Sequence, residues 1–399
     1  MRLALVVSHP IQYHAPFFRR LAAEPGIDLT VYYLWDFGVV PTHDPEFRVK
    51  VKWDIPVLEG YRSIFLKNIA PRPSAKPWGE INPGIVRVLA KGNYDAVVFF
   101  GWNFVSSWLG FFTCMISDTP FFLRGENPWS QEVRKPLWKR FIKKAILWPL
   151  FDAAAGLLYI GKENKEFYSH YGVPDKKLFF VPYMADNARF MAAAKELAPQ
   201  RAELKKELGL APDAVVIPAA GKLIHKKRPL DLLEAYIRFL LHPTRYTLNP
   251  ALVYMGDGEL RGEIERRVLE EKIPNVIITG FRNQTEMPRV YAAADIFVLP
   301  SEAGETWGLV VNEAMCFGLP IVLSNNVGCG PDLLRKEENG LMVATGDVDG
   351  LAHALTELAG NPAERKLFGD RSREIVAEYS FETGVRGIKE ALEALKKPG

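Results

Sequence analysis

The chain has 399 residues, of which 48% are apolar and 24% are charged, and its formal net charge at pH 7 is +3. That length is too great for one ordinary core, so two domains are expected, and the small net charge argues against nucleic acid as a partner. The three cysteines, Cys114, Cys316 and Cys329, show no metal-ligand spacing and leave an odd thiol, which favours a reducing, cytoplasmic location.

The amino-terminal half alternates predicted strands and helices, which is typical of parallel sheets. The predicted strands are short apolar runs at 3–7, 29–34, 96–100, 121–123, 156–160 and 178–181. Residues 36–85, rich in proline and aromatic residues, are predicted as long loops that line an acceptor site. His9 and Pro10 follow the first strand at once, so no secretory signal is expected. No segment reaches the roughly 18 to 20 apolar residues that span a bilayer.

Polar residues near the ends of these strands are the candidate acceptor-binding groups. They are His9, Gln12, His14, Asn103, Arg124 and Glu126. The two histidines flank a proline-closed turn, where a structural role is about as common as a binding role. Arg124 and Glu126 are close enough in sequence to pair with each other instead of binding a ligand. For both pairs of residues, the two interpretations stay open.

Residues 134–148 are predicted to form a helix with two unlike faces. The apolar positions on one side are Trp138, Phe141, Ile142, Ala145 and Trp148. The basic positions on the other side are Lys135, Lys139, Arg140, Lys143 and Lys144. Such a helix could lie on an anionic membrane surface, or it could pack on the domain core with its lysines in water. The sequence leaves both arrangements open.

The second half continues the alternation. A polar helix at 195–208 precedes strands at 214–220, 275–280 and 296–299, and helices are predicted after 228, at 287–294 and at 381–397. Lys222 and Lys227 follow the first of these strands, at the point where a helix begins. By itself, a basic run such as 226–228 is more often a solvated surface than a binding site.

Residues 301–315, Ser-Glu-Ala-Gly-Glu-Thr-Trp-Gly-Leu-Val-Val-Asn-Glu-Ala-Met, join a predicted buried strand to a helix. Gly304 and Gly308 allow the backbone to come close to a ligand, and the helix that begins near Gly308 offers its free N–H groups to a diphosphate. Glu305 and Glu313 are eight positions apart. We therefore expect the two carboxylates to serve different parts of one long ligand.

This order of glycine, acid, aromatic, glycine and a second acid before Ala-Met resembles the signature of the retaining glycosyltransferases of family 4. The resemblance implies an α/β GT-B fold with two Rossmann-like domains whose parallel sheets face a central cleft. It implies an acceptor-binding domain at 1–187, a nucleotide-sugar donor domain at 188–378, and a helix at 379–399 that crosses back to the first domain. The first loop departs from the family because it lacks a glycine pair, and Arg124 and Glu126 stand where many members carry a histidine.

The resemblance also implies roles for residues of the second half. Glu305 would hold the donor sugar and Glu313 the ribose, while Lys222 and Lys227 would stabilise the departing diphosphate, so that Glu305 and the two lysines are the catalytic candidates. The other donor-binding candidates are Gly221, Phe281, Arg282, Gly304, Thr306, Trp307, Gly308 and Leu309. Because the lysines and the helix N-terminus supply the positive charge, neither a metal nor a cofactor is expected.

The predicted function is metal-independent transfer of a sugar, with retention of configuration, from a nucleoside-diphosphate sugar to a hydroxyl group. A UDP-sugar is favoured over a GDP-sugar, and the acceptor is a glycan or lipid-linked sugar of cell-surface polysaccharide or glycolipid synthesis. The alternatives are a nucleotide-sugar epimerase of the same fold, a transferase acting on a soluble small molecule, and a non-catalytic scaffold docked on membranes. The sequence does not identify the donor sugar, the acceptor or the oligomeric state.

Overall fold

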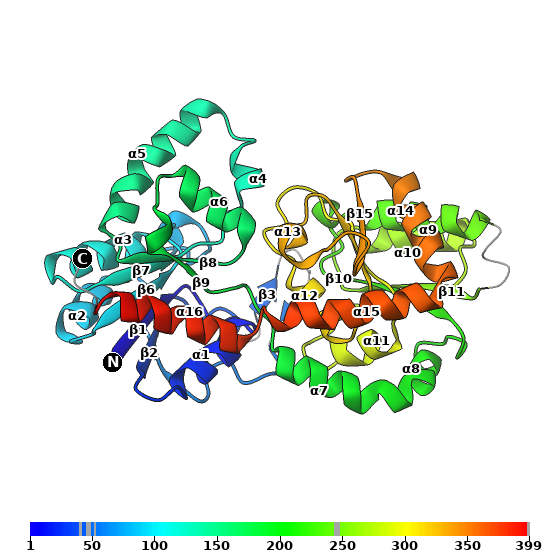
Figure 1. Ribbon diagram of the computed structural model, residues 1–399, viewed down its shortest axis with the longest axis horizontal. Helices are drawn as coiled ribbons and strands as arrows, with labels where there is room; N and C mark the ends of the chain where they lie inside the picture. Colours follow the sequence, from blue (N-terminus) through cyan, green and yellow to red (C-terminus); the bar gives the residue numbers. More distant parts are fainter. Residues whose placement is uncertain (40–41, 45–48, 52, 243–247, 397–399) are drawn as a thin grey trace. The chain divides into compact units, whose positions relative to one another are not determined.

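The computed structural model describes residues 1–39, 42–44, 49–51, 53–242 and 248–396, and the chain divides into two compact units (Figure 1). The first unit comprises Met1–Thr42, Ile55–Tyr183 and Phe381–Gly399, and the second comprises His43–Asp54 and Met184–Ser380. The sequence placed the domain boundaries near residues 187 and 379, and the structure places them after Tyr183 and before Phe381. His43–Asp54 is grouped with the second unit, although the sequence placed it in the first.

The first unit is built on a parallel sheet of seven strands. In spatial order these are β5 (Arg62–Phe65), β2 (Asp28–Tyr33), β1 (Arg2–Val7), β6 (Ala96–Phe100), β7 (Phe121–Arg124), β8 (Gly156–Tyr159) and β9 (Leu178–Phe180). The central strands are buried almost throughout, because helices can cover both faces of a parallel sheet. The strand order reverses between β1 and β6, and ligands of such sheets bind at the carboxyl ends of strands at a reversal of this kind.

The prediction that residues 36–85 are loops is wrong in part. β5 pairs with β2 from Thr30↔Arg62 to Tyr33↔Phe65, and β3 (Thr42–Asp44) pairs with β4 (Val49–Val51). A 3-10 helix, η1, spans Pro77–Gly79, and α2 (Gly84–Lys91) begins before the region ends. Since β5 is a short, partly exposed edge strand, its sequence Arg-Ser-Ile-Phe carries neither a continuous apolar run nor a clean alternation.

The helices of the first unit are α1 (His14–Ala22), α2, α3 (Val105–Ile116), α4 (Trp129–Glu132), α5 (Leu137–Ala153), α6 (Lys162–His170) and α16 (Phe381–Ala394). The helix predicted from residue 134 begins three residues later, because Pro136 is extended and keeps the residue before it out of a helix. α16 packs closely on β9: a Cβ atom added to Gly387 would lie 1.9 Å from the carbonyl oxygen of Phe180. The Lys389 ammonium also lies 2.8 Å from the Glu24 carboxylate.

The second unit holds two three-stranded parallel sheets. One has the order β10 (Val215–Ala220), β11 (Pro250–Met255), β12 (Val276–Ile278), and the other β13 (Phe297–Leu299), β14 (Ile321–Ser324), β15 (Gly340–Val343). The backbone N–H groups of Asp295 and Ile296 both donate to the Val216 carbonyl, at 2.8 and 3.3 Å, so β13 continues the first sheet beside β10. The strand order therefore reverses between β10 and β13, and the carboxyl ends of these two strands define the second expected ligand site.

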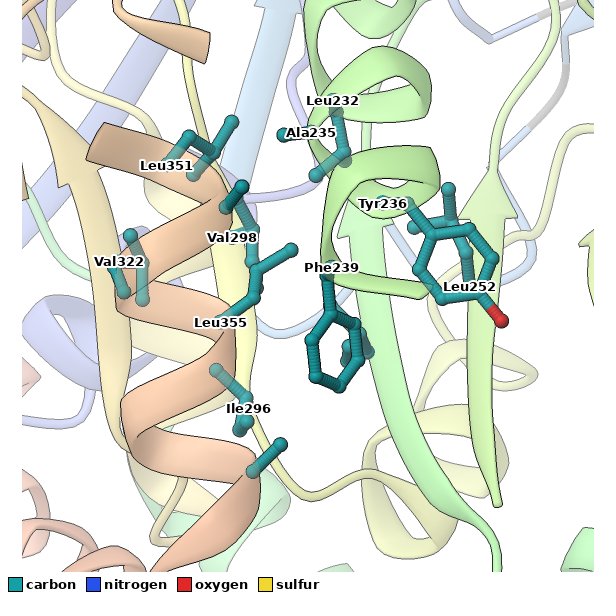
Figure 2. Packing of buried hydrophobic residues seen from close by; sticks show 14 of the residues in the cluster. Leu232, Ala235, Tyr236, Phe239, Leu252, Ile296, Val298, Val322, Leu351 and Leu355 are labelled. Carbon is teal, nitrogen blue, oxygen red and sulfur yellow. The ribbon is translucent and has the colours of Figure 1, made fainter. Parts of the chain in front are cut away.

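Helices α9 (Pro229–Leu241) and α14 (Val348–Gly360) pack side by side over this sheet (Figure 2). Tyr236 and Phe239 of α9 and Leu351 and Leu355 of α14 belong to one buried cluster with Val298, and Tyr236 lies beside Leu252. The remaining helices are α7 (Asn187–Leu197), α8 (Arg201–Glu207), α10 (Arg261–Glu270), α11 (Met287–Ala293), α12 (Leu309–Cys316), α13 (Gly330–Leu333) and α15 (Pro362–Ala377). The polar helix predicted at 195–208 is divided between α7 and α8 by a 3-10 turn, η3 (Ala198–Gln200). Throughout the described ranges, the helices are too short or too polar to cross a bilayer.

Candidate functional site

The donor-side candidates of the second unit gather where β10 and β13 end. β10 leads into Gly221, whose φ of +133° is strained for a residue with a side chain, and then into η4 (His225–Lys227). Arg228 takes the left-handed conformation with φ of +51°, and α9 starts immediately after it at Pro229. This sharp entry holds Lys227 beside the amino end of α9.

Lys227 and Glu305 form an ion pair at this point. The Lys227 ammonium donates to Oε2 of Glu305, and Ser301 Oγ donates to the same oxygen at 3.3 Å. Glu305 is 9% exposed, so both charges are largely withdrawn from water. A carboxylate fixed through one oxygen can still accept hydrogen bonds from ligand hydroxyls at the other. The pair brings together two of the three catalytic candidates.

The third candidate, Lys222, lies on the same small pocket as Lys227. This pocket of about 20 Å³ is also lined by Gly221 at the end of β10 and by Leu299 and Pro300 at the end of β13. Such a volume holds about one water-sized group. Lys222 and Lys227 therefore both border the carboxyl ends of the two strands at the reversal of strand order.

The basic run at 226–228 is not a solvated surface patch. Lys226 donates to the Gly304 carbonyl at 3.4 Å, and its own carbonyl accepts from the Glu302 N–H at 2.9 Å. Arg228 pairs with Asp231 at 2.6 Å and with Glu302 at 3.3 Å. These bonds fasten the start of α9 to the loop that carries Glu305.

The loop from Gly304 to Gly308 turns the chain into α12. Both glycines have positive φ, +108° and +97°, and Gly308 is the N-cap. A Cβ atom on Gly308 would lie 2.9 Å from a methyl carbon of Leu299. α12 begins at Leu309, and the free N–H groups of its first turn make an anion-binding end. Thr306 lies between the glycines and is partly exposed.

Trp307, a donor-binding candidate, is part of the interior. Its Nε1 donates to Asn312 Oδ1 at 2.9 Å, and its ring centroid lies 5.9 Å from that of Tyr379. The residue is 3% exposed, so its side chain is not available to a ligand.

Glu313 lies deeper than Glu305. Its side chain is fully buried on α12, where Oε1 accepts from Gln284 Nε2 at 3.1 Å and Oε2 accepts from the Tyr291 hydroxyl at 2.9 Å. The two carboxylates thus occupy different settings, and the contact of Glu313 with a ribose stays a prediction. Sequence reasoning missed Gln284 and Tyr291 because they meet Glu313 only through the tertiary fold. Sequence reasoning also missed Ser301, although its position just after β13, where ligand-binding residues of parallel sheets lie, could have marked it.

Phe281 and Arg282 follow β12, and the structure separates the Arg282 side chain from the Lys227–Glu305 pair. Arg282 donates to Glu286 at 2.9 Å and lines a different pocket, of about 240 Å³, together with Arg289. Contacts between this segment and a nucleotide base stay a prediction that rests on its backbone.

In the first unit, three acceptor-side candidates lie together near the ends of β6 and β7. The Arg124 guanidinium lies 5.1 Å from the ring centroids of both Phe100 and Tyr183, and it donates to Glu126 at 2.9 Å. The expected alternative, that Arg124 and Glu126 pair, is what the structure shows. His14 packs on the same two rings, and burial, then the charge of Arg124, lowers its pKa well below the ordinary value.

A buried carboxyl group that the sequence did not reveal lies behind the first loop. Ser8 Oγ donates to Glu80 Oε1 and lies 2.9 Å from Nδ1 of His9. Burial raises the pKa of Glu80 to about 7 and lowers that of His9 to about 4. Gln12 Oε1 is buried without a hydrogen-bond partner among the described residues. Glu80 falls in the region predicted as loops, where no pattern marked it.

α5 presents its apolar side outward. The exposed apolar residues of this outward face are Leu137, Trp138, Phe141, Ile142, Ile146 and Trp148, whereas Leu147, Leu150 and Phe151 are buried. The basic side lies toward α4 and α6: Lys143 pairs with buried Glu132 at 2.7 Å, and Arg140 lies 5.0 Å from the Trp129 ring centroid. The alternative in which the apolar side packs on the core is therefore wrong.

Comparison with known proteins agrees with the geometry of the second unit. Residues 200–375 match the family described as glycosyl transferases group 1. This segment is a glycosyl transferases group 1 domain. The structure of Anabaena HepE in complex with UDP and glucose aligns over 98% of this chain and 99% of that chain, with a TM-score of 0.71 and 17% identity. The predicted GT-B fold of two Rossmann-like domains is confirmed.

Two curated relatives of this chain carry names that contain a lipid-linked sugar or a glycolipid. The Escherichia coli UDP-Gal:alpha-D-GlcNAc-diphosphoundecaprenol alpha-1,3-galactosyltransferase is 26% identical over 59% of this chain and 59% of its own length. The Streptococcus pneumoniae alpha-galactosylglucosyldiacylglycerol synthase is 24% identical over 62% of this chain and 63% of its own length. The chain spans about half the length of the curated relatives that it matches.

Proposed function

We propose that this protein is a retaining glycosyltransferase of family 4. It would move a sugar from a nucleoside-diphosphate sugar, with UDP favoured over GDP, to a hydroxyl of a glycan or lipid-linked acceptor. The observation that carries the proposal is the Lys227–Glu305 pair, which lies with Lys222 at the reversal of strand order in the group 1 domain. A site built from two cations and one carboxylate suits a ligand that is both a diphosphate and a sugar.

In the proposed sugar transfer, the two lysines and Glu305 have different roles. The bond between the anomeric carbon and the diphosphate oxygen breaks, the acceptor oxygen bonds to the same face of that carbon, and the leaving phosphate takes the acceptor proton. Lys222, Lys227 and the first turn of α12 stabilise the charge that grows on the diphosphate, without a metal or cofactor. Glu305 holds sugar hydroxyls, and its bond to Lys227 relaxes as that lysine turns toward the phosphate.

A lipid-linked acceptor is supported by the named substrates of the two relatives and by the outward face of α5. Exposed aromatic and aliphatic residues on one side of a helix, with lysines at its flanks, match the interfacial helices of membrane-bound proteins. We propose that this face lies on anionic phospholipid at the cytoplasmic side of the membrane.

Product analysis with a radiolabelled UDP-sugar tests the proposal. Transfer predicts label in an organic-soluble acceptor product and release of UDP, whereas an epimerase would leave the label on the nucleotide with a changed sugar. A membrane scaffold would neither bind nor consume the donor. Because UDP at about 100 times its dissociation constant adds roughly 2.7 kcal/mol of stability, a thermal-shift screen of nucleoside diphosphates identifies the nucleotide.

A further inference from the structure

A pocket of about 400 Å³ in the first unit has no part in the site described above. It lies between α5 and the start of α3, and its walls include Trp102, Trp108, Trp138, Ile142 and Ile146. That volume and that apolar, aromatic lining are typical of small-ligand sites. Its opening adjoins the outward face of α5, because Trp138 and Ile142 belong to both.

The polar residues that line the pocket are Asn103, Lys139 and Lys143, and the Lys143 ammonium is turned to Glu132 and lies 4.6 Å from the Phe167 ring centroid. Among the described residues that line it, none is acidic. Lys143 is held from behind by Glu132, which also pairs with Lys135 at 2.9 Å and is 1% exposed. The single carboxylate of Glu132 thus pairs with both Lys135 and Lys143, so this group of three side chains carries a net positive charge.

Glu132 stays ionised in this arrangement. Burial raises its pKa, but hydrogen bonds from Lys143, Lys135 and the Tyr171 hydroxyl outweigh burial and hold the pKa at about 2. Lys139 makes no ion pair within the described part of the chain, and its ammonium lies 5.3 Å from the Trp138 ring centroid. The pocket therefore offers a neutral, aromatic interior with an uncompensated cation at its edge.

We propose that this pocket binds an anionic single-chain lipid, an alkyl or prenyl phosphate ester, as the carrier part of the acceptor. The chain would lie among Trp108, Trp138 and Ile146, and the phosphate would lie on Lys139 with help from Asn103. The charge complementarity of an apolar groove that ends in an unpaired lysine selects this ligand over a neutral lipid. The inference rests on the proposed function, since it names the acceptor class of that reaction.

The outward face and the pocket can be separated by matched variants. Trp138 and Trp148 are both exposed tryptophans of α5, 62% and 50%, but only Trp138 lines the pocket. Lys139 and Lys144 are both exposed lysines of the helix, but only Lys139 lines it. If the ligand binds in the pocket, its affinity depends on Trp138 and Lys139 only. If the ligand adsorbs to the helix surface, its affinity depends equally on Trp148 and Lys144.

Calorimetric titration of the full chain with geranyl phosphate, in solution and without vesicles, is the test. We expect Trp138→Ala and Lys139→Ala each to weaken binding about tenfold or more, Trp148→Ala and Lys144→Ala to leave it unchanged, and Lys139→Arg to restore most of it. Geraniol and inorganic phosphate, each lacking one half of the ligand, should bind far more weakly. Thermal unfolding of each variant confirms that it folds.

Absence of geranyl phosphate binding, or equal loss in all four alanine variants, would overturn the inference. UDP should bind at the donor site of the second unit and should bind all four alanine variants equally; loss of UDP binding in Trp138→Ala and Lys139→Ala alone would also overturn the inference, because the pocket would then recognise a phosphorylated aromatic ligand. Donor hydrolysis is measured on the same variants. If geranyl phosphate binds as expected but the wild-type chain neither hydrolyses nor transfers a sugar, the proposed reaction fails while the lipid site stands.

Discussion

Glu80 makes the stability of the first unit depend on pH. Its carboxyl group is fully buried, and burial raises its pKa from 4.5 to about 7, opposed by the hydrogen bond from Ser8. A carboxyl whose folded pKa is raised stabilises the fold below its unfolded pKa, and that contribution is lost as the pH rises through about 7. Since one pKa unit corresponds to about 1.4 kcal/mol, complete ionisation of Glu80 destabilises the fold by about 3 kcal/mol.

Glu80→Gln removes the titrating group and keeps its size. We expect the free energy of unfolding of the wild type to fall, relative to the variant, by about 2.5 kcal/mol between pH 5 and pH 8.5. Buried His9 and His14 have lowered pKa values and lose stability in the opposite direction, as the pH falls, but they are present in both proteins and cancel in the difference.

Urea unfolding followed by far-ultraviolet circular dichroism at several pH values measures this difference. The transition of the second unit serves as the internal control, because Glu80 lies in the first unit. A constant offset between the wild type and Glu80→Gln across the pH range would refute the reasoning, since an offset reports only the lost or gained hydrogen bonds of the amide.

Three further predictions concern the donor site and the membrane. Glu305→Gln should lower turnover more than about tenfold, a loss of over 1.4 kcal/mol, and a smaller loss in steady-state assays would remove Glu305 as the main sugar contact. Lys227→Ala should weaken UDP binding and turnover, and the matched Lys226→Ala should cause a smaller loss. Chelators should leave turnover unchanged. Activity that is lost on chelation and restored by a divalent ion would contradict metal-free catalysis. Phe141→Asp combined with Trp148→Asp should abolish co-sedimentation with anionic vesicles, because burying each ring contributes about 2 kcal/mol, while Leu367→Asp, an exposed apolar residue of the second unit, should not.

The sequence by itself determined the fold class and pointed to the residues at the centre of the candidate donor site. Continuous apolar runs predicted most of the long parallel strands because such strands bury both faces, and glycines 304 and 308 marked the turn beside Glu305, where both residues have positive φ. The resemblance to family 4 predicted that Lys227 and Glu305 act at one site, and their ion pair fits this prediction, since parallel strands end at one edge.

Only the tertiary structure decided which side chains are available and what they face. The sequence predicted that Glu313 contacts the ribose of a ligand, but it did not show that Gln284 and Tyr291 occupy its two oxygens in the interior. Glu80 had no local signal, because its burial depends on strands far away in the sequence. Helical periodicity placed the two faces of α5 correctly but could not say which one points inward: that is set by Glu132 of α4, which draws Lys143 toward the protein and leaves the aromatic side exposed.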